Sequence, residues 1–150
     1  MILSLLEGAG FSPSNLKKLN KAFLEYFKER KYYSTVKDIN QGFCMNWAWI
    51  VYKLFGGELW INEDFYHAFV KIGNKFYDAQ TVNGVSEWID IGGLRKQRKG
   101  MQALIDHGQA NVHRSNEREF TFYFHLNDLK TQEETKTVLD IYSGLTGGAK

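Results

Sequence analysis

The sequence predicts an α+β fold in which helices pack on an antiparallel β-sheet. Two amphipathic helical patterns come first, at 12–31 and 44–55. Short extended segments rich in aromatic and β-branched residues follow, and helical patterns return near the C-terminus. Helices grouped before and after consecutive strands are typical of an α+β domain. With 150 residues, the chain is expected to form a single domain over 1–150.

Composition narrows the function classes. The hydrophobic fraction of 43% is typical of a packed globular protein, and the net charge of +2 gives no general reason to expect nucleic acid or membrane binding. The single cysteine cannot form an internal disulfide or a Cys-rich zinc site, and the histidines lack metal-ligand spacing. We therefore expect a cytoplasmic protein without a metal or other cofactor.

The first helix is predicted over 12–31, with Ser12 as its N-cap and Pro13 at its first position. Its apolar positions recur at helical spacing: Leu16, Leu19, Phe23 and Phe27. The next segment, 32–42, is expected to be a loop or short extended structure. The second helix, 44–55, carries one apolar stripe and ends before Gly56, which suits a C-terminal cap: Trp47, Ile50, Val51 and Leu54.

The sheet and the remaining helices are expected over 58–143. Strands are predicted at 58–62, 66–72, 75–80 and 118–125, and helices at 94–108 and 129–144. The segment 85–91 fits either a helix or a strand. The last helix has a possible capping box at Thr131 and Glu134, and a flexible tail is expected over 145–150.

Cys44 lies at the predicted start of the second helix. A helix N-terminus favours a thiolate, and its free N–H groups can stabilise an oxyanion. The preceding Asn40 and Gln41 carry side-chain amides that could donate to the same oxyanion. The competing interpretation is a small buried side chain, because free cysteine packs well in protein cores.

The segment 67–80 predicts a β-hairpin that brings a histidine and a carboxylate together. Gly73 and Asn74 fit the centre of a two-residue turn of type I′ or II′, which would place Val70 opposite Tyr77. In that register His67 and Asp78 share one face as diagonal neighbours. An acid beside a histidine can orient its ring. Alternatively, His67 is a strand histidine satisfied by the backbone, and Asp78 is a turn carboxylate.

Two segments resemble the papain-like and transglutaminase-like superfamily, in its small bacterial or phage form. "HAFVKIGNKFYDAQTVNGV" is similar to the His and Asp strands of that superfamily, and "GFCMNWAWIVYKLFGG" is similar to its nucleophile helix. The resemblance covers about residues 39–85. It implies a papain-like core, with Cys44 as the nucleophile, His67 as the base and Asp78 as the residue that orients His67. It also implies a place in the cytoplasm of a bacterial or host cell.

The expected function is a small cysteine hydrolase or acyltransferase that acts on an amide or thioester carbonyl. A peptidase or amidase is preferred, and the sequence leaves open whether water or an amine resolves the acyl-enzyme. The expected partner is a peptide, protein or small amide substrate, and Trp60 could line its cleft. The basic cluster 95–99 is interpreted as a solvated helix face. The alternative is a catalytically inactive module of the same fold that binds proteins or has a structural role.

Overall fold

The structure is a computed structural model that describes residues 10–28, 30 and 34–147. The α-helices are α2 (Pro13–Phe27), α3 (Val36–Gly42), α4 (Cys44–Phe55), α5 (Arg98–Asp106), α6 (Glu117–Tyr123) and α7 (Leu129–Thr146). The strands are β1 (Glu58–Asn62), β2 (His67–Ile72), β3 (Lys75–Tyr77) and β4 (Val112–Ser115). Two 3₁₀ segments, η1 (Trp88–Asp90) and η2 (Gly92–Gln97), precede α5.

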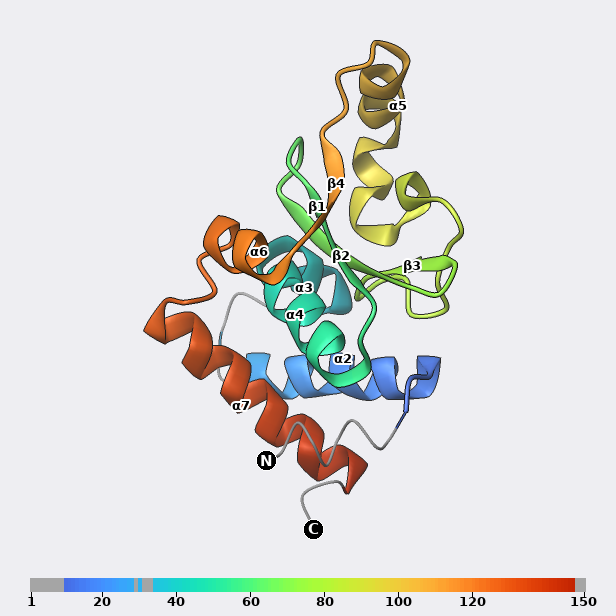
Figure 1. Cartoon of the computed structure of the whole chain (residues 1–150). Helices are drawn as coiled ribbons and strands as arrows, with labels where there is room; N and C mark the ends of the chain where they lie inside the picture. The colour runs from blue at the N-terminus through green and yellow to red at the C-terminus, as the bar shows by residue number, and fades with distance from the viewer. Residues whose placement is uncertain (1–9, 29, 31–33, 148–150) are drawn as a thin grey trace.

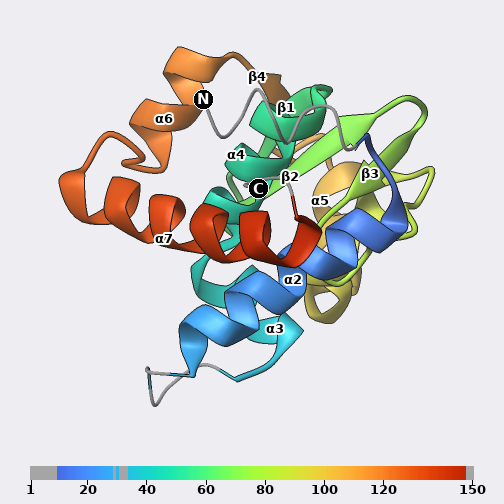
Figure 2. The ribbon, with the colours of Figure 1, turned by 90° about the horizontal axis from the view of Figure 1, so that it is seen from below.

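The strands form one antiparallel sheet in the order β3-β2-β1-β4, which confirms the predicted α+β class. α4 packs on one face of the sheet, mainly against β2, and α2 and α7 pack on each other beyond α4 (Figures 1 and 2). A smaller core on the other face joins the sheet to the η1–η2 segment; its buried members are Phe69, Phe76, Ile91 and Leu94. Both faces of the sheet are therefore covered.

The two predicted helices form where their caps and apolar stripes indicate. The Ser12 hydroxyl accepts the Asn15 N–H at 3.1 Å, and α2 begins at Pro13. α4 runs from Cys44 to Phe55, as predicted. All eight predicted apolar-stripe positions of α2 and α4 are buried. However, α2 ends at Phe27 instead of reaching residue 31; residues 29 and 31–33 lie outside the described part of the chain.

The β2–β3 hairpin has the predicted register, with Val70 opposite Tyr77. Gly73 has a φ of 62° while Asn74 does not have a positive φ, which fits the type II′ turn. β3 is nevertheless shorter than predicted, because it ends at Tyr77. The side-chain carboxylate of Asp78 accepts a hydrogen bond from the N–H of Gln80 at 3.1 Å. The backbone carbonyl of Asp78 accepts one from the N–H of Thr81 at 2.9 Å. This local turn replaces the strand pairing expected after residue 77.

Two segments have a different structure from the one predicted. Residues 36–42, expected to be loop or extended, form α3, because Thr35 and Asp38 make a capping box. The strand predicted over 118–125 is wrong: this segment belongs largely to α6. The Asn116 side chain accepts the N–H of Glu119 at 2.8 Å, which starts a helix. Phe120 is then buried and Phe122 is exposed, so helical periodicity overrides the high β-propensity of the segment.

The C-terminal boundaries also differ. α7 begins after the N-cap Asp128, so the capping box predicted at Thr131 and Glu134 is wrong. The helix continues to Thr146, which places residues 145 and 146 in a helix and not in a flexible tail. The ambiguous segment 85–91 contains η1, and the helix predicted over 94–108 is divided between η2 and α5. In the described part of the chain no helix is long and apolar enough to span a membrane.

Asn20 joins three elements inside the larger core. Its Nδ2 donates to the carbonyl of Ala79 at 2.8 Å, and its Oδ1 accepts the indole N–H of Trp47 at 2.7 Å. Asn20→Ala would leave the carbonyl of Ala79 and the indole N–H of Trp47 buried without the hydrogen bonds that Asn20 makes to them. We expect a loss of about 2–4 kcal/mol in the free energy of unfolding, measured by urea denaturation. Lys21→Ala, at an exposed position of the same helix, is the control and should change the free energy of unfolding by less than about 0.5 kcal/mol. Equal effects of the two substitutions would contradict this role of Asn20.

Candidate active site

The candidate site lies at the end of the sheet where β2 begins. His67 is the first residue of β2, Cys44 is the first residue of α4, and Gly93 belongs to η2. α4 packs on one face of the sheet and η2 on the other, so groups from both sides can meet only at such an end (Figure 1). This position explains how residues distant in sequence approach one another.

Cys44 faces the turn between β1 and β2. Its sulfur lies 3.9 Å from the carbonyl oxygen of Tyr66, and Cys44 is close enough to His67 to affect the pKa of that histidine. As the first residue of α4, Cys44 has a backbone N–H without an acceptor inside the helix. The side chain is only 3% exposed, so the thiol lies beneath the residues that form the surface here.

The predicted histidine and aspartate form a buried pair. His67 Nε2 lies 2.9 Å from Asp78 Oδ2, and both side chains are almost fully buried. An ionised carboxylate only accepts hydrogen bonds, so the shared proton is assigned to Nε2. Nδ1 is then the ring nitrogen left for Cys44. The structure therefore pairs His67 with Asp78, and it places Cys44 close enough to affect the pKa of His67.

Asp78 is held by the backbone as well as by His67. Gly93 N–H donates to Oδ2 at 2.7 Å, and Gln80 N–H donates to Oδ1 at 3.1 Å. A fully buried carboxylate requires such donors, since an unpaired buried charge is strongly destabilising. The orientation of Asp78, and through it that of His67, is consequently fixed by two loop segments.

The protonation of the pair follows from these contacts. Burial by itself lowers the pKa of His67, but the hydrogen bond to Asp78 and the interactions with Cys44 outweigh it and raise the pKa to about 10. Burial likewise raises the pKa of Asp78, but the hydrogen bond and charge of His67 outweigh this effect and lower it. At neutral pH the pair is thus an imidazolium and a carboxylate.

A cleft of about 570 Å³ opens beside His67. The predicted residues Asn40 and Gln41 line it, together with Tyr66, Gln80 and Gly93. Asn40 Nδ2 donates to Gln80 Oε1 at 2.9 Å, while the buried Asn40 Oδ1 has no hydrogen-bond partner among the residues that the structure describes. Asn40 and Gln41 thus lie where a substrate could reach them.

Trp60 lies elsewhere. Its ring packs against Phe69 and Phe76 in the smaller core, with ring centroids 6.2 and 5.3 Å away, and its indole N–H donates to Glu58 at 3.2 Å. It does not line the cleft beside His67. The position of Trp60 therefore corrects the expectation that it forms a wall of this cleft.

Comparison with models of protein families, with curated proteins and with solved structures finds no match for this chain. The chemistry must therefore be inferred from the geometry of the site itself.

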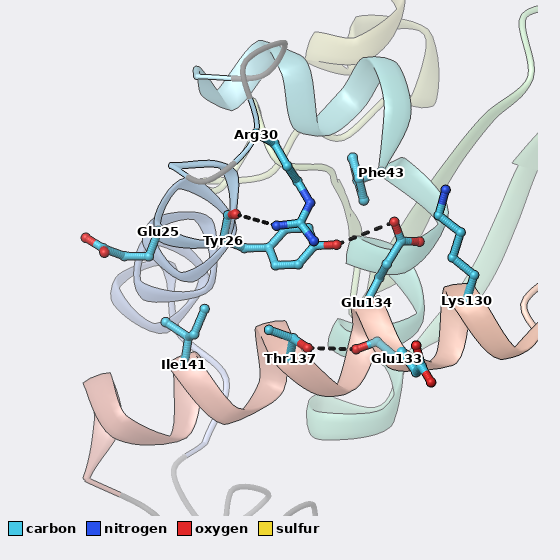
Figure 3. Close-up of a pocket in the computed structure, with 9 residues that line it drawn as sticks. All are labelled: Glu25, Tyr26, Arg30, Phe43, Lys130, Glu133, Glu134, Thr137 and Ile141. Carbon is cyan, nitrogen blue, oxygen red and sulfur yellow. Dashed lines mark hydrogen bonds between the residues drawn. The ribbon is translucent and has the colours of Figure 1, made fainter.

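A second cavity, of about 580 Å³, lies between α2 and α7 (Figure 3). It contains no cysteine and no histidine. Its aromatic and charged side chains already interact: Tyr26 Oη donates to Glu134 at 3.4 Å, and the Arg30 guanidinium lies 3.9 Å from the centroid of the Tyr26 ring. These contacts are those of a structural groove, so the cleft beside His67 is the better candidate.

The other histidines do not join the site. His113 pairs with Glu63 at 2.9 Å, and His125 lies in the turn after α6, with a φ of 56°. Across residues 10–28, 30 and 34–147, no group of three or more His, Cys, Asp or Glu side chains could hold a metal ion.

The contact of Gly93 with Asp78 was not predicted from the sequence. A Cβ atom built on this residue would lie 2.8 Å from Asp78 Oδ2 and still closer to the His67 ring. Only glycine lets the backbone approach the pair closely enough to donate to Asp78. The adjacent glycines 92 and 93 are the only signal in the sequence, and they do not indicate which residues they approach.

Gly93→Ala is expected to displace His67 or Asp78 by steric conflict. We expect a loss of about 1–3 kcal/mol in the free energy of unfolding and the disappearance of the His67 Nε2 proton signal from NMR spectra. Gly100→Ala in α5 is the matched control, because its nearest neighbour, Phe65 Cζ, is 3.7 Å away. Alanine there should be neutral or stabilising. An unperturbed His67 signal in Gly93→Ala would contradict the steric role.

The raised pKa of His67 predicts a pH-dependent contribution to stability. The pair stabilises the fold fully below the ordinary histidine value of 6.5 and loses this contribution as the pH rises towards 10. His67→Gln keeps a neutral N–H donor. The difference in unfolding free energy between the wild type and His67→Gln should therefore shrink by more than about 1 kcal/mol from pH 6.5 to pH 10. A constant difference would contradict the imidazolium assignment.

Proposed function

We propose that this protein is a small cysteine hydrolase or acyltransferase with a papain-like or transglutaminase-like core. The single observation that carries the proposal is the buried pair of His67 and Asp78, 2.9 Å apart, with Cys44 close enough to affect the pKa of His67. A nucleophile, a base and a group that orients the base make up the constellation needed for acyl transfer. Peptidase or amidase activity is the first choice.

In the proposed reaction, His67 holds the Cys44 thiol proton on Nδ1. The sulfur attacks the substrate carbonyl carbon, and a C–S bond forms while the carbonyl oxygen becomes an oxyanion. The C–N bond then breaks, and His67 gives its Nδ1 proton to the departing amine. An acyl thioester remains on Cys44. Water or a second amine, deprotonated by His67, attacks this thioester, breaks the C–S bond and restores the starting state.

The oxyanion requires donors on the side of the cleft. The N–H of Cys44 at the start of α4 is the first donor that we propose. The side chain of Asn40 is the second candidate. Its amide presents Oδ1 without a partner, and exchanging the O and N positions of Asn40 and Gln80 would keep their mutual hydrogen bond and present Nδ2 instead. Gln41, which is exposed on the cleft wall, could contact the substrate.

Asp78 is proposed to act through orientation. Its hydrogen bond to Nε2 selects the tautomer in which Nδ1 faces the sulfur, and its charge stabilises the imidazolium. Because Gly93 and Gln80 fix the carboxylate, the ring is already oriented before substrate binds. This preorganisation supports a catalytic function for the pair, since a buried ion pair contributes little stability compared with apolar residues of the same volume.

The alternative function is a module of the same fold that binds proteins or has a structural role. The 3% exposure of Cys44 favours it, because a thiol that substrate cannot reach does not react. The two functions differ in the chemical reactivity of Cys44.

Alkylation of Cys44 by iodoacetamide at pH 6–7 distinguishes them. We expect rapid labelling of the folded protein, followed by mass spectrometry, and at least about tenfold slower labelling in His67→Ala, because the sulfur then lacks its proton acceptor. His113→Ala is the control, since His113 also pairs with a carboxylate but lies outside the site. Labelling that requires unfolding would rule out the enzyme.

A further inference from the structure

The cleft beside His67 has a basic rim. Lys37 on α3 and Arg95 and Lys96 on η2 all line it, and no aspartate or glutamate does. We call these three residues the cationic rim. They come from two separate segments, α3 and η2, that pack against each other. Positive charge therefore gathers on the cleft where a substrate would lie, and the basic cluster 95–99 is not simply a solvated helix face.

None of the three forms an ion pair with any residue in the described part of the chain. The neighbouring acidic residues have other partners. Asp38 accepts the N–H groups of Ser34 and Thr35, each at 2.9 Å, and Asp90 pairs with Arg98 at 2.9 Å. The lowered pKa of Asp38 is due mainly to the backbone N–H groups of Ser34 and Thr35 and only in small part to the charge of Lys37, so Asp38 is a weak counter-charge for Lys37 and not an ion-pair partner.

Two of these cations lie close together. The proximity of Lys37 lowers the pKa of the Lys96 amine. Like charges brought together without an intervening anion repel, and binding of an anion between them removes the repulsion. An anionic group in the cleft would thus have at least two cationic partners, one from α3 and one from η2.

The cationic rim is also joined directly to the candidate site. Arg95 and Lys96 follow Gly93 in η2, and Gly93 donates to Asp78. The side of the cleft near Phe65 and Tyr66 is different, because exposed aromatic rings lie there. The cleft therefore has one basic and one aromatic side.

We propose that Lys37, Arg95 and Lys96 form an anion subsite, so that the substrate carries a carboxylate or phosphate beside the carbonyl that Cys44 attacks. This inference rests on the proposed function and specifies its substrate class: an acidic peptide or amide. Guanidinium and ammonium groups bind carboxylate and phosphate through charge-assisted hydrogen bonds.

The first test uses peptidyl chloromethyl ketones that differ only by Glu or Gln next to the reactive carbonyl. The Glu reagent should alkylate Cys44 about tenfold faster than the Gln reagent at low salt, and added salt should reduce the difference. Lys37→Gln/Lys96→Gln should reduce the ratio of the two alkylation rates, Glu reagent over Gln reagent, to about one. Lys17→Gln/Lys18→Gln is the control, because it removes two exposed charges of α2 that lie outside the cleft. This variant should keep the preference for the Glu reagent. A phosphoserine reagent shows whether phosphate is preferred to carboxylate.

The second test measures binding without chemistry. Glu and Gln peptides with unreactive carboxamide ends are titrated into Cys44→Ala by calorimetry, and the Glu peptide should bind about tenfold more tightly. Equal rates and equal affinities for the two peptides would overturn the anion subsite, even if Cys44 reacts rapidly. Preferential binding of the Glu peptide together with an unreactive Cys44, or with labelling indifferent to His67→Ala, would overturn the proposed function but retain the subsite.

Discussion

The buried carboxylate of Asp78 is the constraint on which the rest of the site depends. A charge in this position is tolerated only because His67, Gly93 and Gln80 donate to it. Each donor comes from a different segment, so the start of β2, the turn after β3 and η2 must meet at one point. Asn20 supports the same point from α2, because it binds the carbonyl of Ala79 next to the carboxylate. The local fold is thus organised around one acid, and the orientation of the His67 ring is a consequence.

Short-range patterns predicted the parts of this arrangement that depend on neighbouring residues. The cap at Ser12, the apolar stripes of α2 and α4 and the register of the β2–β3 hairpin all follow from spacing within about 15 residues. That register places His67 and Asp78 on one face, which was enough to predict their association. The prediction that Cys44 lies beside this pair depended on the resemblance to a known superfamily. Helix and hairpin patterns alone do not specify how the helix and the hairpin pack together.

The parts that could not be predicted depend on tertiary contacts or on a single polar cap. α6 has the composition of a strand, but Asn116 starts a helix whose Phe120 reaches the core. A carboxylate turn at Asp78 ends β3 early, although the alternation of side chains continues past it. Gly93 approaches Asp78 across 15 residues of irregular chain, and no periodicity describes such a path. Trp60 looked like a cleft residue because it is aromatic, but its face of β1 belongs to the smaller core.

In the proposed function, the η2 segment would link orientation of the base to recognition of the substrate. Gly93, near its N-terminus, donates to Asp78, whereas Arg95 and Lys96 line the cleft. An anion bound by the cationic rim would interact with η2, the same short segment whose Gly93 donates to the Asp78 carboxylate. Because a 3₁₀ segment has poorer hydrogen-bond geometry than an α-helix, its position depends on such contacts more than that of α4 does. The structure of this segment is therefore consistent with the proposed role, because within six residues one glycine approaches the buried pair and two cations line the cleft.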